Sequence, residues 1–447
     1  MKLRFLATAA RSGLIAIVLV YSGVAHCGED AFAKWAATHA LPVTKVESAS
    51  NDSDLLPLES AIVTARIVAL GEPMHGAHEP LAFRNRLFRF LVERMGFTAI
   101  ALESGFTESI SARSFIEGGE GDAETAARTG LSSWANRYLE NRELIQWMRD
   151  YNATASSAGH RRIRLYGIDI TAGGRKNGPW LAIDSALTFL SRGDPIAAQK
   201  IRHSLSDSLS GIDAREFGSL PAAAQAVFDT SIKAIAKAMR MSRESLIARS
   251  SEEEYRWALH NLDVARQLAK CLPITPSPKA DMNAWARAMT CRDSGMAENV
   301  QWAFENEGRQ GRLLVFAHNG HVMSAKEDGR RMANVREKPS TMGLNLRRAY
   351  GKDLYIIAMV CATTSGGLLT AKPLEEGSIE STLAGVGLPL MFLDVRMARQ
   401  NKEALTWLST RRSVNANVSS QSLITLSTAV DAFLFVNTLT PAIQKSD

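Results

Sequence analysis

Four apolar, β-rich runs, each followed by a polar or charged residue, constrain the fold of this chain more than any other feature of its sequence. These runs are Arg66 to Leu70 before Gly71-Glu72, Thr98 to Leu102 before Glu103, Ile163 to Ile168 before Asp169, and Arg312 to Ala317 before His318. Short apolar runs of this composition predict buried strands. Two further strands are predicted at Leu354 to Val360 and Ala432 to Val436.

Helical patterns separate the predicted strands. Between Glu79 and Met95 the apolar side chains recur at helical spacing, and Gly96 follows where a glycine commonly ends a helix. Repetition of a strand, helix, strand unit is typical of a parallel sheet covered by helices on both faces. The sequence therefore predicts an α/β fold with a mainly parallel sheet flanked by helices.

A largely helical insertion is predicted within this fold. The pattern is helical between about Trp180 and Leu272, and Ser250 with Glu253 is a candidate capping box for one of the helices. The insertion serves either as a lid over a substrate pocket or as a packing element. The predicted segments are a signal peptide over 1–27, an N-terminal segment over 28–54, core over 55–177, the insertion over 178–280, and core over 281–447.

The first residues predict export to the periplasm or to the outside of the cell. Lys2 and Arg4 precede a short apolar stretch, and the small residues Ala25 and Cys27 provide a cleavage site. The apolar run is well below the ~20 residues that span a bilayer, so we expect no membrane span. Lipid attachment at Cys27 is the alternative to simple cleavage. Loss of this segment lowers the net charge from +6 to +3, which is too weak a balance to indicate a nucleic-acid partner.

Three cysteines remain in the mature chain: Cys271, Cys291 and Cys361. Cys271 and Cys291 flank a proline-rich stretch, and an exported protein can hold a disulfide there. Three buried free thiols are the alternative. The cysteine spacing shows no zinc motif of the Cys-x-x-Cys kind.

Four of the nine histidines lie in two short windows that directly follow predicted strands. His75 and His78 follow the strand that ends before Glu72, and His318 and His321 follow a later one. Ligands of parallel α/β sheets bind beyond the carboxyl ends of the strands, so these windows and Glu103 should converge in space. A lone histidine or glutamate is usually a structural or surface residue. Convergence of several of them predicts a site.

The absence of three common catalytic and nucleotide-binding motifs limits the reactions that this site can catalyse. The sequence contains no Gly-x-Ser-x-Gly nucleophile elbow, no phosphate-binding loop and no dinucleotide fingerprint. Histidine held by a carboxylate can take a proton from water at neutral pH, and a nearby arginine or second histidine can stabilise the oxyanion that forms. The sequence favours hydrolysis by an activated water.

The chain resembles the erythromycin esterase family in an ordered set of motifs across about residues 55 to 445. These motifs are Leu70-Gly71-Glu72-Pro73-Met74-His75-Gly76, Phe83-Arg84, Gly96 to Glu103, Tyr166 to Asp169, Arg292 to Ala297, Ala317 to Val322, Met342-Gly343 and Asp431 to Val436. Met74 departs from the family, whose members commonly have a small residue there.

The resemblance implies an ester hydrolase that acts on a macrolactone or a related cyclic ester without a metal or other cofactor and without a covalent intermediate. It implies that His75 is the general base, oriented by Glu72 and Glu103. Arg84, His318 and His321 are expected to line the same cleft and to bind or polarise the carbonyl group. The partner is thus a small ester or lactone, and nothing in the sequence indicates an oligomeric state.

Two other functions use the same residues. The two His-x-x-His windows, together with Glu72, Glu79 or Glu103, have the donor types that bind zinc, manganese or iron, which would make the protein a metal-dependent hydrolase. A noncatalytic binding protein on the same scaffold is the third interpretation. Sensitivity to a chelator separates the first two.

Overall fold

The computed structural model describes residues 31–48, 52–133, 135–170, 178–209, 217–272, 281–326, 328, 332, 334–417 and 420–444. The predicted signal peptide and Cys27 lie outside the described residues. Residues 31–39 form a helix at the end of the molecule opposite the insertion, where Phe32 stacks on Trp407 with 4.1 Å between ring centroids.

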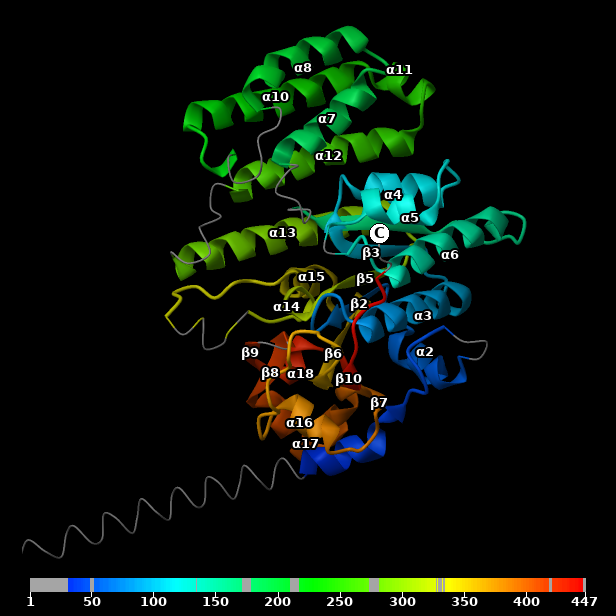
Figure 1. The fold of residues 1–447 in the computed structure, drawn as a ribbon, viewed down its shortest axis with the longest axis vertical. Coiled ribbons are helices and arrows are strands. Elements are labelled where there is room, and N and C mark those ends of the chain that lie inside the picture. The colour runs from blue at the N-terminus through cyan, green and yellow to red at the C-terminus, as the bar shows by residue number, and fades with distance from the viewer. Residues whose placement is uncertain are drawn as a thin grey trace, which may run out of the picture.

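An eight-stranded sheet forms the centre of the described part of the chain, in the order β1-β7-β10-β6-β2-β5-β3-β4 (Figure 1). Its strands are β1 (Leu41–Pro42), β2 (Ile67–Glu72), β3 (Ala99–Gly105), β4 (Arg164–Asp169), β5 (Leu313–His318), β6 (Leu354–Thr364), β7 (Leu390–Asp394) and β10 (Ala432–Leu439). All neighbours from β10 to β4 are parallel, and β7 and β1 add antiparallel strands at one edge. The predicted mainly parallel sheet is confirmed.

Helices cover both faces of this sheet because successive residues along each buried strand direct their apolar side chains to opposite faces. Val68, Leu70 and Ile100 pack with α3 and α6 on one face, whereas Ile67 and Ala69 belong to the core shared with α13 and α15. The helices outside the insertion are α2 (Leu56–Ile62), α3 (His78–Met95), α4 (Ser109–Ile116), α5 (Ala123–Gly130), α6 (Leu139–Ala155), α13 (Met282–Asn306), α14 (Asn319–Val322), α15 (Met342–Tyr350), α16 (Ile379–Ala384), α17 (Lys402–Ser409) and α18 (Leu426–Ala429).

Short elements complete the periphery. The 3-10 helices are η1 (Ser53–Leu55), η4 (Gly351–Asp353) and η5 (Val395–Gln400), and β8 (Arg411–Asn417) pairs with β9 (Ser420–Thr425) in a separate two-stranded sheet. Helix α3 ends as predicted, because Gly96 adopts the left-handed conformation at φ 68° that closes it. No helix in the described ranges combines the length and the apolarity needed to cross a membrane.

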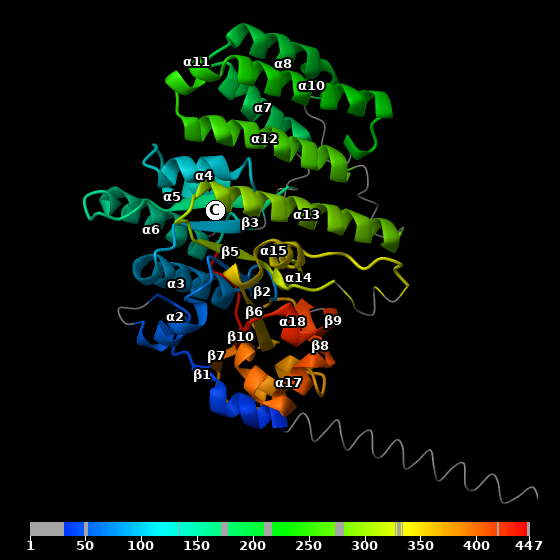
Figure 2. The ribbon, with the colours of Figure 1, turned by 180° about the vertical axis from the view of Figure 1, so that it is seen from behind.

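The predicted insertion consists of α7 (Gly178–Leu190), α8 (Pro195–Leu209), α10 (Ala222–Met241), α11 (Arg243–Ala248) and α12 (Glu252–Cys271). These helices lie together at one end of the molecule, beyond α4 and α13 (Figures 1 and 2). Helix α12 contacts the core through Glu253, whose carboxylate accepts hydrogen bonds from Arg164. The predicted cap was wrong by one residue. Ser251, not Ser250, accepts the capping bond from the Glu254 N–H at 3.1 Å.

Candidate active site

The strand ends bring the predicted residues together. Strands β2, β5 and β3 are neighbours in the sheet, and Glu72 on β2 is in register with His318 on β5. Glu103 lies near the end of β3, and His75 follows β2 by three residues. Salt-bridge contacts connect His75 to Glu72 and both His75 and His321 to Glu103. The convergence predicted from strand ends is confirmed for Glu72, His75, Glu103, His318 and His321, but not for His78.

His75 and Glu72 form a hydrogen-bonded pair. Nδ1 of His75 lies 2.7 Å from Oε1 of Glu72, which is fully buried, while the His75 side chain is 36% exposed. Burial alone lowers the pKa of His75, but the hydrogen bond and charge of Glu72 outweigh it and raise the pKa above its ordinary value. A carboxylate on Nδ1 keeps the proton of the neutral ring there, so that Nε2 carries the lone pair of the base.

Glu103 supplies the negative charge at the centre of the cluster. Its Oε1 accepts a hydrogen bond from Nη2 of Arg292 at 2.9 Å, and its Oε2 accepts one from the backbone N–H of His318 at 2.8 Å. Burial alone raises the pKa of Glu103, but the nearby His321 and Arg292 lower it well below its usual range. Glu103 is therefore an ionised carboxylate, and its Oε1 lies 3.8 Å from Nε2 of His75.

Arg292, on α13, is a member of the cluster to which the sequence analysis gave no role. Its guanidinium donates to both oxygens of Asp169, at 3.0 and 2.6 Å, as well as to Glu103. Burial alone would lower the pKa of Arg292, but Asp169 and Glu103 raise it, so the cation persists. This bidentate geometry suits arginine and not lysine. Asp169 follows a predicted strand, as Glu72 and Glu103 do. That position could have indicated Asp169 as a member of the cluster, but no local pattern indicated Arg292.

The pKa values of His318 and His321 are shifted in opposite directions. His318 Nδ1 accepts the Gly320 N–H at 3.1 Å, and burial together with the charge of His75 lowers its pKa to about 3, so the ring is neutral. Nδ1 of His321 lies 2.8 Å from Oδ1 of Asp293. Burial alone lowers the pKa of His321, but Asp293 and Glu103 raise it to about 10. Together these groups place a base, a neutral His318 ring and the Arg292 cation at the strand ends, with Nη1 of Arg292 3.1 Å from Nε2 of His321.

The comparisons with known proteins show the family of the chain. The sequence model of the erythromycin esterase family matches residues 92–439, which is most of the chain. This chain belongs to the erythromycin esterase family. Glu103, His318 and His321 lie inside the matched range, and Glu72, His75 and Arg84 precede it.

Individual relatives resemble the chain in sequence, and solved structures share its fold. The chain is 23% identical over 404 residues to erythromycin esterase type II of Escherichia coli, an alignment that covers 84% of this chain and 91% of that relative. A crystal structure of a Bacillus cereus protein shares the fold, with a TM-score of 0.78, 23% identity, and coverage of 94% and 99% of the two chains. A mutant of the erythromycin esterase EreC in its open conformation has a TM-score of 0.63 at 19% identity and coverage of 87% and 94%. Membership of this family indicates a hydrolase.

Arg84, which the resemblance placed in the cleft, is buried in the core. Its side chain is 2% exposed, its guanidinium donates twice to Oδ1 of Asn85, and it lies 4.9 Å from the ring centroid of Phe316. Burial lowers the pKa of Arg84 to about 10, while the charge of Glu72 opposes that shift. Arg84 thus supports Glu72 electrostatically from within the core and is not open to a substrate in this conformation.

His78 belongs to a different cluster from His75. Its Nδ1 lies 2.6 Å from Oε1 of Glu140, and its Nε2 lies 3.3 Å from Oε1 of Glu47. These residues border a hollow of about 920 Å³ between α3 and α6. Within the part of the chain that the structure describes, no group of three or more His, Cys, Asp or Glu side chains is arranged to hold a metal ion.

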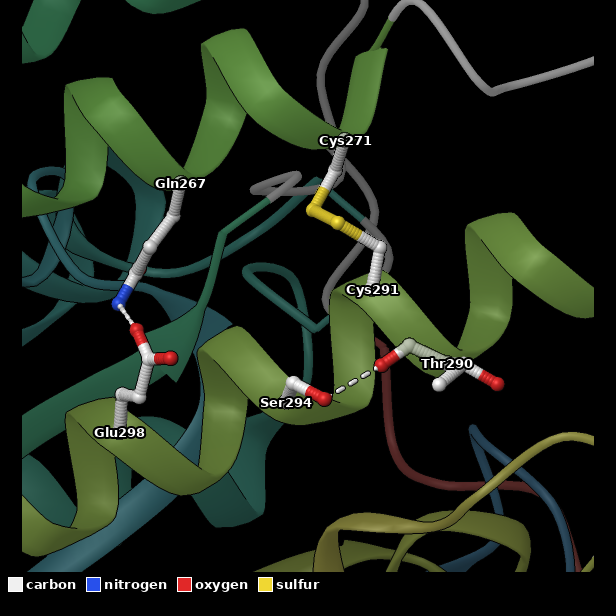
Figure 3. The surroundings of a disulfide bond; sticks show 6 residues. All are labelled: Gln267, Cys271, Thr290, Cys291, Ser294 and Glu298. Atoms are coloured by element: carbon white, nitrogen blue, oxygen red, sulfur yellow. Dashed lines mark hydrogen bonds between the residues drawn. A yellow bond between two sulfur atoms is a disulfide. The ribbon is translucent and has the colours of Figure 1, made fainter.

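A disulfide lies directly beside the cluster. Cys271, the last residue of α12, is bonded to Cys291, which precedes Arg292 on α13 (Figure 3). One turn away, Gln267 donates a hydrogen bond to Glu298 between the same two helices at 2.9 Å. The structure confirms the disulfide over the alternative of free thiols, and the remaining described cysteine, Cys361, is a buried thiol.

Proposed function

We propose that this protein hydrolyses a carboxylic ester, in the form of a macrolactone or a related cyclic ester, by means of a water molecule that His75 activates. The observation that carries the proposal is the His75–Glu72 pair at 2.7 Å, in which a buried carboxylate holds Nδ1 of a partly exposed imidazole. A positioned base of this kind contributes ~10²–10⁴-fold to a rate. The name of the Escherichia coli relative, erythromycin esterase type II, supports the substrate class.

The proposed reaction needs no covalent intermediate. Nε2 of His75 takes a proton from water as the water oxygen bonds to the ester carbonyl carbon. The negative charge that develops on the carbonyl oxygen is stabilised by the neutral His318 ring, whose centroid is 5.4 Å from that of His75, and by the positive charge of Arg292. The carbon–oxygen bond to the alcohol then breaks, and the alkoxide takes the proton back from His75. The products are a carboxylic acid and an alcohol, joined in one open chain when the substrate is a lactone.

The placement of Arg292 favours this mechanism over the metal-dependent alternative. The guanidinium of Arg292 lies among Glu103, Asp169 and His321, where the carboxylates would otherwise be available to a divalent cation. His78, which the metal hypothesis needs beside His75, is bound to Glu140 and Glu47 instead. Three imidazoles of the two windows, those of His75, His318 and His321, lie together, whereas His78 is held by other partners.

Incubation of the mature protein with a panel of macrolides and simple lactones tests the proposed function. We expect mass spectrometry to detect the gain of one water by at least one member of the panel, and we expect exhaustive EDTA treatment to leave that rate unchanged. Activity that EDTA abolishes and zinc or manganese restores would favour the metal-dependent hydrolase. Tight binding of a lactone without any water gain would favour the binding protein.

The raised pKa of His75 predicts the pH dependence of the rate. The base must be neutral, and Glu72 stabilises its protonated form, so kcat/KM should rise with pH through a midpoint above the ordinary histidine value of about 6.5. Glu72→Gln removes that charge, and the midpoint should then move to lower pH. The pH–rate profiles of the two proteins, both checked for folding by circular dichroism, measure the shift. An unchanged acidic limb in Glu72→Gln would contradict the assignment of His75 as the base.

A further inference from the structure

The last described residues of the chain cross the ends of the parallel strands. After β10 the chain continues as Thr440–Gln444, which we call the C-terminal strap, and it reaches the beginning of α6 (Figure 1). Because β10, β6 and β2 are parallel, the strap leaves the sheet at the edge where Glu72 and His75 lie. The strap therefore passes beside the loop of residues 73–77 that carries His75.

The strap is hydrogen-bonded to the first turn of α3. The backbone N–H of His78 donates to the Thr440 carbonyl at 2.8 Å. In return, the backbone N–H and the hydroxyl of Thr440 donate to the two carboxylate oxygens of Glu79, at 2.8 and 2.7 Å. One threonine is thus held by three hydrogen bonds at the point where the loop of His75 becomes a helix.

The strap also contacts the loop itself. The Ala442 N–H donates to the Gly76 carbonyl at 2.9 Å, and Ala77 and Pro441 form an antiparallel bridge. Gly76 has a φ of 80°, and a Cβ there would lie 2.6 Å from the hydroxyl oxygen of Tyr138. The peptide that follows His75 is therefore confined between the strap on one side and Tyr138 on the other.

The far end of the strap is fixed to α6. The Ile443 carbonyl accepts the Leu139 N–H at 2.9 Å, and the Ile443 N–H donates to Oε1 of Glu140 at 3.2 Å. Glu140 is 2% exposed, and its Oε1 also lies 2.6 Å from Nδ1 of His78. One buried carboxylate thus joins the strap, α6 and the start of α3.

We propose that the C-terminal strap is a positioning element for His75, with Glu79 and Thr440 as its principal positioning residues. This inference rests on the proposed function of His75 as the base. Strand β2 fixes the start of the His75 loop at Glu72, and the C-terminal strap fixes the end of that loop at Gly76 and Ala77. The backbone that carries the imidazole is therefore held on both sides of His75. A displacement of ~1 Å of a catalytic group can cost ~10²-fold in rate, which is why such support from outside the reacting groups matters.

Three variants of the full chain test the positioning role. Thr440→Val removes only the hydroxyl contact to Glu79, Thr440→Ser retains it, and truncation after Leu439 removes the strap. We expect kcat on the lactone identified by the panel to fall by ~3–10-fold in Thr440→Val and by ~10²-fold in the truncated protein, with KM nearly unchanged. Thr440→Ser should restore kcat. Truncation after Gln444 and Thr154→Val, at an exposed threonine of α6, are the matched controls.

Amide hydrogen exchange gives a second measurement that does not depend on activity. The peptide that spans residues 73–79 should exchange faster in the truncated protein and in Thr440→Val than in the controls. The His78 N–H donates to the Thr440 carbonyl, which truncation removes and which Thr440→Val holds less firmly. Unchanged exchange and unchanged kcat in Thr440→Val would overturn the proposal, even if the truncated protein failed to fold. If His75→Ala kept full activity, the proposed function of His75 would be wrong. Faster exchange in the truncated protein and in Thr440→Val would still show that the strap holds the loop.

Discussion

Replacement of His75 by alanine should lower the turnover number on any lactone that the protein hydrolyses by at least ~10²-fold, because loss of a positioned general base costs about that much. The side chain is 36% exposed, so we expect the variant to fold, although the buried Glu72 carboxylate loses its hydrogen bond to the imidazole. The measurement is single-turnover hydrolysis followed by mass spectrometry.

Two variants control for shape and for histidine content. His75→Asn keeps a polar side chain that can still bond to Glu72, yet it cannot act as a base near neutral pH, and it should be as inactive as His75→Ala. His160→Ala removes an exposed histidine far from the cluster in sequence and should keep full activity. A folded His75→Ala protein with an unchanged turnover number would eliminate the mechanism proposed here.

Replacement of Arg292 by methionine should have the second large effect, and here we expect loss of stability as well as of activity. The change leaves the buried carboxylates of Glu103 and Asp169 without the cation that joins them, and breaking a buried ion pair costs ~3–5 kcal/mol. Urea unfolding of the purified protein measures the loss. Arg292→Lys keeps the charge but not the fork of donors, so it should recover only part of the stability.

An exposed arginine on the same helix provides the matched control. Arg287→Met lies on α13 five residues before Arg292 and should change the free energy of unfolding by less than ~0.5 kcal/mol. If Arg292→Met and Arg287→Met had the same stability, the cation would not be the centre of the buried cluster.

The sheet and the convergence of the candidate site residues could be predicted because both depend on local sequence patterns. An apolar run that ends in a polar residue indicates where a buried strand emerges, and parallel strands bring such ends to one edge. Glu72 and His318 are 246 positions apart in sequence, yet they are in register in the sheet as this argument requires. The helix from His78 to Met95 followed from its apolar spacing and its terminal glycine in the same way.

Other features depend on contacts that no local pattern contains. Arg292 joins Asp169 across 123 positions, so its role becomes visible only when α13 packs on β4. His78 was grouped with His75 because of spacing, but α3 begins at His78 and directs its ring to Glu140. The cap of α12 was placed one residue early because Ser250 and Ser251 are each followed three positions later by a glutamate. Local sequence did not distinguish them.

The disulfide limits how the helical insertion can move. The bond joins the last residue of α12 to the residue before Arg292, so the end of the insertion nearest the cluster is covalently attached to the core. A large displacement of that end would pull on the backbone next to the guanidinium that holds Glu103 and Asp169. Any movement of α8, α10 and α11 relative to the sheet must therefore leave this end of α12 attached to α13.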